Sequence, residues 1–195
     1  MTPKQIERLQ KKISEIRQAL AAEKRKYGGY DDSRGLRYLP TRSFIQLSDY
    51  KGGLTYLRWF SKNFPDDAGF PDFLFEWTII LFKNGKPNEA AKKAFETFCA
   101  NTYLFDKFFA RPIVPIDKYE WSNLAAPGFT EHFTYSGKQP ELADFSEWLA
   151  NLIASPEFES RSKQYIEIYK RLKTEQDRET RHYLLMQARQ LEEGT

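Results

Sequence analysis

Residues 71–101 read PDFLFEWTIILFKNGKPNEAAKKAFETFCAN, and this stretch decides the fold class. Its first half is apolar at helical spacing up to Lys83, and Asn84-Gly85 then supplies a turn. The second half carries Ala90 and Ala94, small residues that let two helix backbones approach closely. The stretch therefore predicts a helical hairpin.

An earlier stretch, residues 37–65, repeats this arrangement more loosely. Phe44 lies on its first helix, Asp49-Tyr50 at its turn and Gly53 at the small position of its second helix. Phe64-Pro65-Asp66-Asp67 ends the stretch. Because Pro40 would interrupt the first helix, we expect that helix to start near Thr41.

Both stretches resemble tetratricopeptide (TPR) units, which are helix–turn–helix repeats of about 34 residues. The second unit matches the repeat at Leu74, Trp77, Leu81, Asn84-Gly85-Lys86 and Ala90, and departs from it at Thr78 and Thr102. The resemblance covers about 65 of the 195 residues. It implies an all-α, TPR-like helical hairpin array over residues 34–110 that needs flanking helices as caps.

The amino-terminal segment, residues 1–27, predicts an amphipathic helix from Pro3 to Lys26. Its apolar residues recur in a heptad-type stripe: Ile6, Leu9, Ile13, Ile16 and Leu20. A coiled coil needs three to four heptads and this stripe has about two and a half, so we expect it to pack on the body of the protein. A homodimer through this helix is the alternative. Residues 27–33 read as a linker.

Beyond residue 110 the sequence changes character. Two prolines favour an extended segment over residues 111–115, and residues 116–139 lack clear helical periodicity. Five aromatic residues from Tyr119 to Tyr135 favour an ordered, packed loop over residues 111–139. Helical patterns return over residues 140–195, with starts at Pro140, Ser155-Pro156 and Asp177. We expect these helices to pack on the same single domain as the hairpins.

Composition excludes several classes of protein. The chain holds 16 Phe, 11 Tyr and 4 Trp, too many aromatic residues for a largely disordered chain. One Cys and two His exclude a disulfide framework and a zinc finger. The sequence shows no secretory signal and no membrane-spanning apolar run, so we expect a cytoplasmic protein with no membrane partner.

Candidate catalytic residues are few. Cys99 lies in an apolar run and reads as a buried small hydrophobe. His132 and His182 have no metal-ligand spacing around them. The acidic residues Asp66, Asp67, Asp72 and Glu76 are interpreted as helix-capping groups. We therefore expect no enzyme activity, no metal and no cofactor.

Partner binding is the favoured function. TPR arrays bind peptides or protein surfaces along the first helices of their units, so the resemblance implies a partner-binding face on the helix over residues 72–83 and on its weaker counterpart. Lys83 and Arg42 there could pair with acidic groups. The alternative is that the apolar members of this face are buried under the caps. The candidate partner-binding residues are Asp72, Phe75, Ile79, Phe82, Lys83, Tyr38 and Arg42.

Two other functions remain open. Residues 1–37 hold 10 basic and 5 acidic side chains, so the amino-terminal helix could contact nucleic acid. The net charge of +3 and the core spacing of the aromatic residues give that reading little support. An enzyme with a site in the 110–139 loop is the third alternative.

Overall fold

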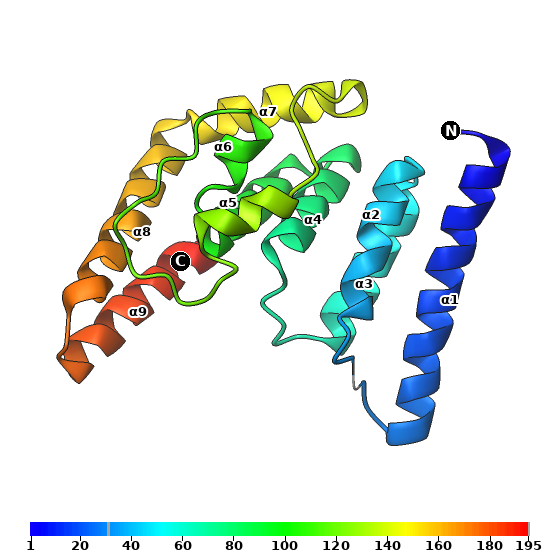
Figure 1. Cartoon of the computed structure of the whole chain (residues 1–195), viewed down its shortest axis with the longest axis horizontal. Coiled ribbons are helices and arrows are strands. Elements are labelled where there is room, and N and C mark those ends of the chain that lie inside the picture. Colours follow the sequence, from blue (N-terminus) through cyan, green and yellow to red (C-terminus); the bar gives the residue numbers. More distant parts are fainter. Residues whose placement is uncertain (31, 195) are drawn as a thin grey trace. The chain divides into compact units, whose positions relative to one another are not determined.

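The computed structural model describes residues 1–30 and 32–194, and every regular element in this part of the chain is a helix (Figure 1). The prediction of an all-α fold is confirmed. Asp31, within the expected linker, lies outside the described residues. The α-helices are α1 (Pro3–Tyr27), α2 (Leu39–Gln46), α3 (Tyr50–Asn63), α4 (Pro71–Lys83), α5 (Pro87–Ala100), α6 (Leu104–Phe108), α7 (Ala143–Ile153), α8 (Pro156–Thr174) and α9 (Arg178–Glu193). Three 3₁₀ turns accompany them: η1 (Leu36–Tyr38), η2 (Pro127–His132) and η3 (Pro140–Leu142).

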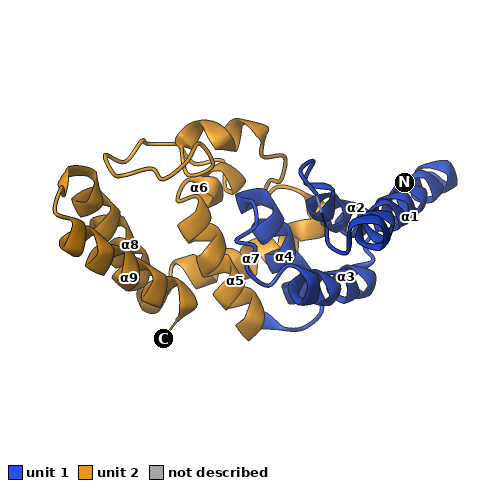
Figure 2. Cartoon of the chain, turned by 90° about the horizontal axis from the view of Figure 1, so that it is seen from below, with its two compact units in different colours: residues 1–87 blue, residues 88–195 orange. Residues whose placement is uncertain are grey.

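The chain divides into two compact units, which are coloured separately in Figure 2. Unit 1 is Met1–Pro87 and unit 2 is Asn88–Thr195. This boundary falls inside the 34–110 segment that the sequence predicts as one array, directly after Pro87, the first residue of the second helix of its better-matching hairpin.

In unit 1, helix α1 begins and ends where its capping residues place it. Thr2 and Gln5 form a capping box, and Gly28 ends the helix in the left-handed conformation with a φ of 74°. Ile13 and Leu20 of the apolar stripe are buried, and Ile13 packs in a cluster with Phe44 of α2. Packing of this stripe on the body of the protein is therefore confirmed for its carboxyl-terminal part.

Helices α2, α3 and α4 form the core of unit 1. Gly53 of α3 is the point of close approach, because a Cβ there would lie 3.0 Å from Ile80 Cδ1 and 3.3 Å from Phe44 Cβ. The expected start of α2 near Thr41 is wrong by two residues, since the helix begins at Leu39. Pro40 lies in the first turn, where its missing N–H has no intrahelical partner to lose.

Unit 2 is built around fully buried aromatic side chains. Tyr103, Phe95, Phe108 and Phe145 each expose less than 2% of their surface. Helices α8 and α9 lie side by side (Figure 1), and their amino-terminal caps are Ser155 and Asp177, as the sequence predicts.

The 111–139 loop is ordered by hydrogen bonds to helices of unit 2. Tyr119 N donates to the carbonyl of Tyr169 at 2.8 Å, and Asn101 Nδ2 donates to the carbonyl of Leu124 at 2.7 Å. Phe133 and Tyr135 are buried. These contacts agree with the expected packed loop.

Within the described residues, no helix combines the length and the apolar character needed to cross a membrane.

Candidate functional site

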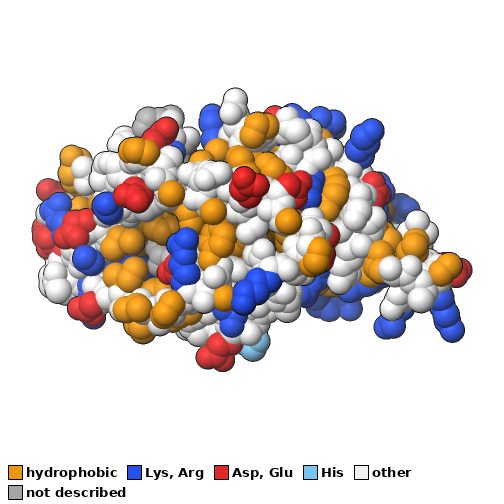
Figure 3. Space-filling view, turned by 90° about the horizontal axis from the view of Figure 1, so that it is seen from above, with side chains coloured by type: hydrophobic (Ala, Val, Ile, Leu, Met, Phe, Trp, Pro, Cys, Tyr) orange, Lys and Arg blue, Asp and Glu red, His pale blue; other side chains and the backbone are white. Residues whose placement is uncertain are grey.

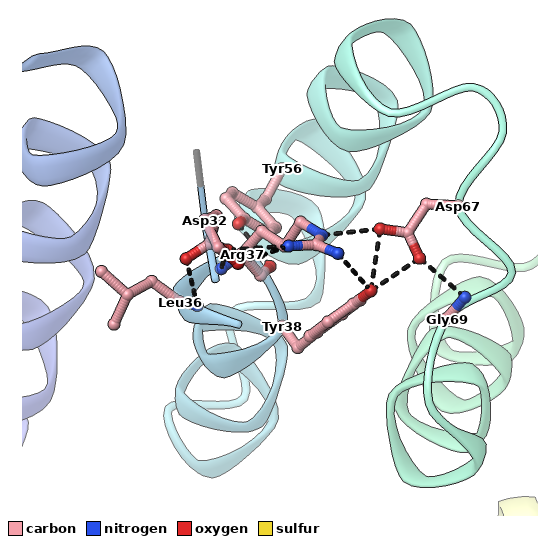
Figure 4. A network of polar contacts seen from close by, with 7 residues as sticks. All are labelled: Asp32, Leu36, Arg37, Tyr38, Tyr56, Asp67 and Gly69. Carbon is pink, nitrogen blue, oxygen red and sulfur yellow. Dashed lines mark hydrogen bonds and ion pairs between the residues drawn. The ribbon is translucent and has the colours of Figure 1, made fainter. Parts of the chain in front are cut away.

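A network of polar contacts in unit 1 is centred on Arg37 (Figure 4). Arg37 Nε donates to Asp67 Oδ2 at 2.6 Å, and Arg37 Nη1 lies 3.2 Å from Asp32 Oδ2. Its guanidinium also stacks 4.4 Å from the centre of the Tyr38 ring. One arginine thus ties the segment before α2 to the loop between α3 and α4.

The partners of Arg37 are themselves held in place. Asp32 accepts the backbone N–H groups of Leu36 and Arg37, each at 2.8 Å, and Tyr56 donates its hydroxyl to the carbonyl of Arg37 at 2.6 Å. The Asp67 carboxylate accepts the Tyr38 hydroxyl at 2.6 Å. These hydrogen bonds fix the backbone at Leu36 and Arg37, because its polar groups are bonded to side chains of the protein.

The protonation states of Tyr38 and Asp67 favour the hydrogen bond between them. Burial and the bonded Asp67 carboxylate raise the pKa of Tyr38, so its hydroxyl stays a donor at neutral pH. Burial acts to raise the pKa of Asp67, but hydrogen bonds from Tyr38, Gly69 and Arg37 outweigh it and hold that pKa below its ordinary value.

The lowered pKa of Asp67 predicts an acid-sensitive contribution to stability. A carboxyl with a lower pKa in the folded state stabilises the fold above its unfolded pKa of about 3.9, and this contribution is lost as pH falls through the folded pKa. We expect Asp67→Asn to be less stable than the wild type at pH 7 and to lose less stability on acidification. Urea midpoints between about pH 3 and pH 7 measure both effects.

Asp66→Asn is the matched control, because Asp66 is the neighbouring carboxylate and its side chain is exposed. It should follow the wild-type curve. An Asp67→Asn variant with the wild-type pH dependence would contradict the role given to the Asp67 carboxylate.

The structure divides the seven predicted partner-binding residues into three groups. Phe75 and Ile79 are 0% exposed, so a partner could not reach these two side chains. Phe82 and Lys83 lie half-buried at the carboxyl-terminal end of α4, where the Lys83 ammonium lies 5.7 Å from the centre of the Tyr50 ring. The remaining residues, Tyr38, Arg42 and Asp72, lie at the amino-terminal ends of α2 and α4.

These last three residues belong to a surface that also carries exposed apolar side chains. Leu39 is 43% and Phe70 39% exposed, and the Phe70 ring lies 4.7 Å from the Tyr38 ring in an edge-on contact. Desolvation raises the pKa of Asp72, while the charge of Arg42 acts in the opposite direction. We call this group, made of Tyr38, Leu39, Arg42, Phe70 and Asp72, the α2–α4 surface.

The acidic residues near α4 do not all cap it as expected. Glu76 is buried in the helix, where its carboxylate accepts the hydroxyl of Thr41 on α2. Asp67 belongs to the Arg37 network. The capping interpretation is therefore wrong for these two residues.

Cys99 has the environment expected from the sequence. It is buried, and burial raises the pKa of its thiol well above the ordinary value. A thiol without an accessible thiolate form is a poor nucleophile.

Among residues 1–30 and 32–194, no group of three or more His, Cys, Asp or Glu side chains is placed to hold a metal ion.

Lys118, in the 111–139 loop, is a residue that sequence reasoning missed. It is 7% exposed, and burial lowers the pKa of its ammonium while Glu120, 3.9 Å away, opposes that effect. Its ammonium also lies 5.3 Å from the centre of the Tyr103 ring. The contact with Tyr103 helps to hold the loop in place within unit 2. The burial of Lys118 left no periodic signal in the sequence.

The basic residues of α1 are partly engaged in contacts within unit 1. Lys24 Nζ donates to Asn63 Oδ1 at 3.0 Å, and Lys11 lies 3.8 Å from Glu15. On the face shown in Figure 3, charged side chains of both signs are interspersed with hydrophobic ones. Neither observation adds support for a nucleic-acid partner.

Comparison with protein-family models, curated proteins and solved structures gave no match for this chain. The class that the structure defines is an all-α protein. The TPR resemblance stays a prediction.

Proposed function

We propose that the protein is a non-enzymatic interaction module that binds a peptide or protein surface, and that the partner binds at the α2–α4 surface. The exposure of Leu39 and Phe70 carries the proposal, since large exposed apolar side chains grouped on a surface are typical of interaction sites. The Arg37 network supports it by fixing the backbone beside them.

Charge complementarity indicates the chemistry of the partner. Arg42 and Asp72 place one cation and one anion beside the apolar side chains, and both residues are exposed. The groups around Asp72 still desolvate its carboxyl enough to raise its pKa. A matching partner presents an apolar side chain flanked by groups of opposite charge. Such a partner is a protein segment. The site keeps three of the seven residues implied by the TPR resemblance. It leaves out Phe75 and Ile79, which are buried, and Phe82 and Lys83, which lie at the other end of α4.

Photo-crosslinking followed by titration tests the proposal. A photoreactive phenylalanine at position 39 should capture the partner in cells, whereas the same group at Tyr27, which is 62% exposed at the end of α1, should not. With the purified partner, we expect Leu39→Ala and Phe70→Ala each to raise the Kd about tenfold, as central apolar contacts do.

Tyr27→Ala is the control for this titration and should leave the Kd unchanged. Circular dichroism should show that each variant retains its helices. A partner that binds Leu39→Ala and Phe70→Ala as tightly as the wild type would overturn the site. Capture of a nucleic acid whose affinity falls steeply with salt would overturn the proposed function.

A further inference from the structure

A groove with a volume of about 480 Å³ lies in unit 2, lined by residues from α5 to α8. This volume falls within the range of small-ligand sites, roughly 300–1,000 Å³. Its aromatic lining is Phe98, Phe105 and Phe158, each less than one-tenth exposed. The Phe158 ring lies 5.8 Å from Phe98 and 6.2 Å from Phe105. The lining therefore offers an apolar, mainly aromatic surface.

Two hydroxyl groups of the lining make no hydrogen bond of ordinary geometry within the described part of the chain. They are Thr102 Oγ1 and Ser162 Oγ, and both atoms are buried. Thr102 is 8% exposed, and its hydroxyl interacts only weakly with Tyr103. Both residues line the groove. A buried hydroxyl with no partner destabilises the fold, and a ligand that supplies a hydrogen-bonding group removes this cost.

The charged residues of the lining form two pairs of opposite sign. Arg111 lies 3.8 Å from Asp106, and Lys163 lies 3.3 Å from Glu159. All four residues line the groove, so the positive and negative charges balance. A neutral ligand fits this balance better than an anion or a cation does.

We propose that this groove binds a neutral, mainly apolar small molecule that carries a hydrogen-bonding group such as a hydroxyl. The aromatic lining takes the apolar body, and Thr102 and Ser162 take the polar group. The site lies in unit 2 and uses no residue of the α2–α4 surface. The outcome of its test is therefore independent of the proposed function.

Three probes that share one ring system test the ligand chemistry on the full chain. They are 2-naphthol, which is neutral with a hydroxyl, naphthalene, which lacks a hydrogen-bonding group, and 2-naphthoate, which is an anion. Titrations followed by amide NMR shifts should give the tightest binding for 2-naphthol. Absence of 2-naphthol binding up to its solubility, or equal or tighter binding of 2-naphthoate, would overturn the proposal.

Thr102→Val and Ser162→Ala remove the hydroxyls and keep the groove apolar. We expect the double variant to bind 2-naphthol about tenfold more weakly, while its affinity for naphthalene stays within about twofold of the wild type. Ala154→Trp places a large side chain in the lining and should abolish binding of both probes. Unchanged 2-naphthol binding in either variant would contradict the site.

Melting temperature provides a readout that needs no ligand. Thr102→Val should melt a few degrees higher than the wild type, because it removes a buried hydroxyl that makes no hydrogen bond of ordinary geometry. Thr97→Val is the matched control, since the Thr97 hydroxyl donates to the carbonyl of Lys93 at 2.8 Å and its loss should bring no gain. A Thr102→Val variant that melts below the wild type would show that the hydroxyl is already satisfied within the protein.

Discussion

Replacing Phe95 by alanine is expected to lower the free energy of unfolding of unit 2 by about 3–5 kcal/mol. Phe95 is 0% exposed, and its ring lies 5.9 Å from Phe98 and 5.4 Å from Phe158. The Arg161 guanidinium lies 3.9 Å from the centre of the same ring. Truncation therefore leaves a cavity beside two aromatic residues of the groove and removes a cation–π contact.

Urea unfolding followed by circular dichroism measures this loss, and hydrogen exchange of peptides from residues 88–194 assigns it to unit 2. Phe109→Ala is the matched control. Phe109 lies in the same unit but is only half-buried, so its truncation should cost about 1 kcal/mol or less. Equal losses in the two variants would contradict the central packing role of Phe95.

Arg37→Ala is expected to destabilise unit 1 by roughly 2–4 kcal/mol. The Arg37 side chain is 20% exposed, whereas those of Asp32 and Asp67 are 1% and 12% exposed. Removing the arginine leaves two poorly solvated carboxylates without their cation, and such a loss costs more than the pairs themselves contribute. Urea unfolding, with hydrogen exchange of residues 34–70, measures the effect.

Two further variants sharpen this test. Lys11→Ala breaks a pair whose side chains are 75% and 63% exposed, and it should change stability by about 0.5 kcal/mol or less. Arg37→Lys keeps the charge but loses the planar fork, so we expect a loss between those of the other two variants. An Arg37→Ala variant as stable as Lys11→Ala would show that the network does not stabilise unit 1.

Local patterns predicted the helices well, because short-range chemistry decides where a helix begins and ends. Ser155 accepts the N–H of Phe158 and Asp177 accepts that of Thr180, three residues along the chain in each case. Apolar periodicity likewise identified the buried side of α1. The small size of Gly53 likewise predicted close packing, and a Cβ there would lie within 3.3 Å of Ile80 and Phe44.

The candidate site was harder to predict because it depends on contacts between distant residues. Arg37 and Asp67 are 30 residues apart, and no local spacing joins them. The burial of Phe75 and Ile79 did leave a signal. Helix α4 is apolar on most of its sides between Phe73 and Phe82, and such a helix is buried rather than open along one face. The proposed ligand site in unit 2 depends on two buried hydroxyls that make no hydrogen bond of ordinary geometry. No local sequence pattern predicts such a feature.

The burial of Cys99 has a practical consequence. It is the one cysteine in the sequence, it is 4% exposed, and burial raises the pKa of its thiol. A thiol-specific reagent can therefore label the chain only when the surroundings of α5 open. The rate of labelling therefore reports how often unit 2 opens around Cys99, and the measurement needs no engineered probe.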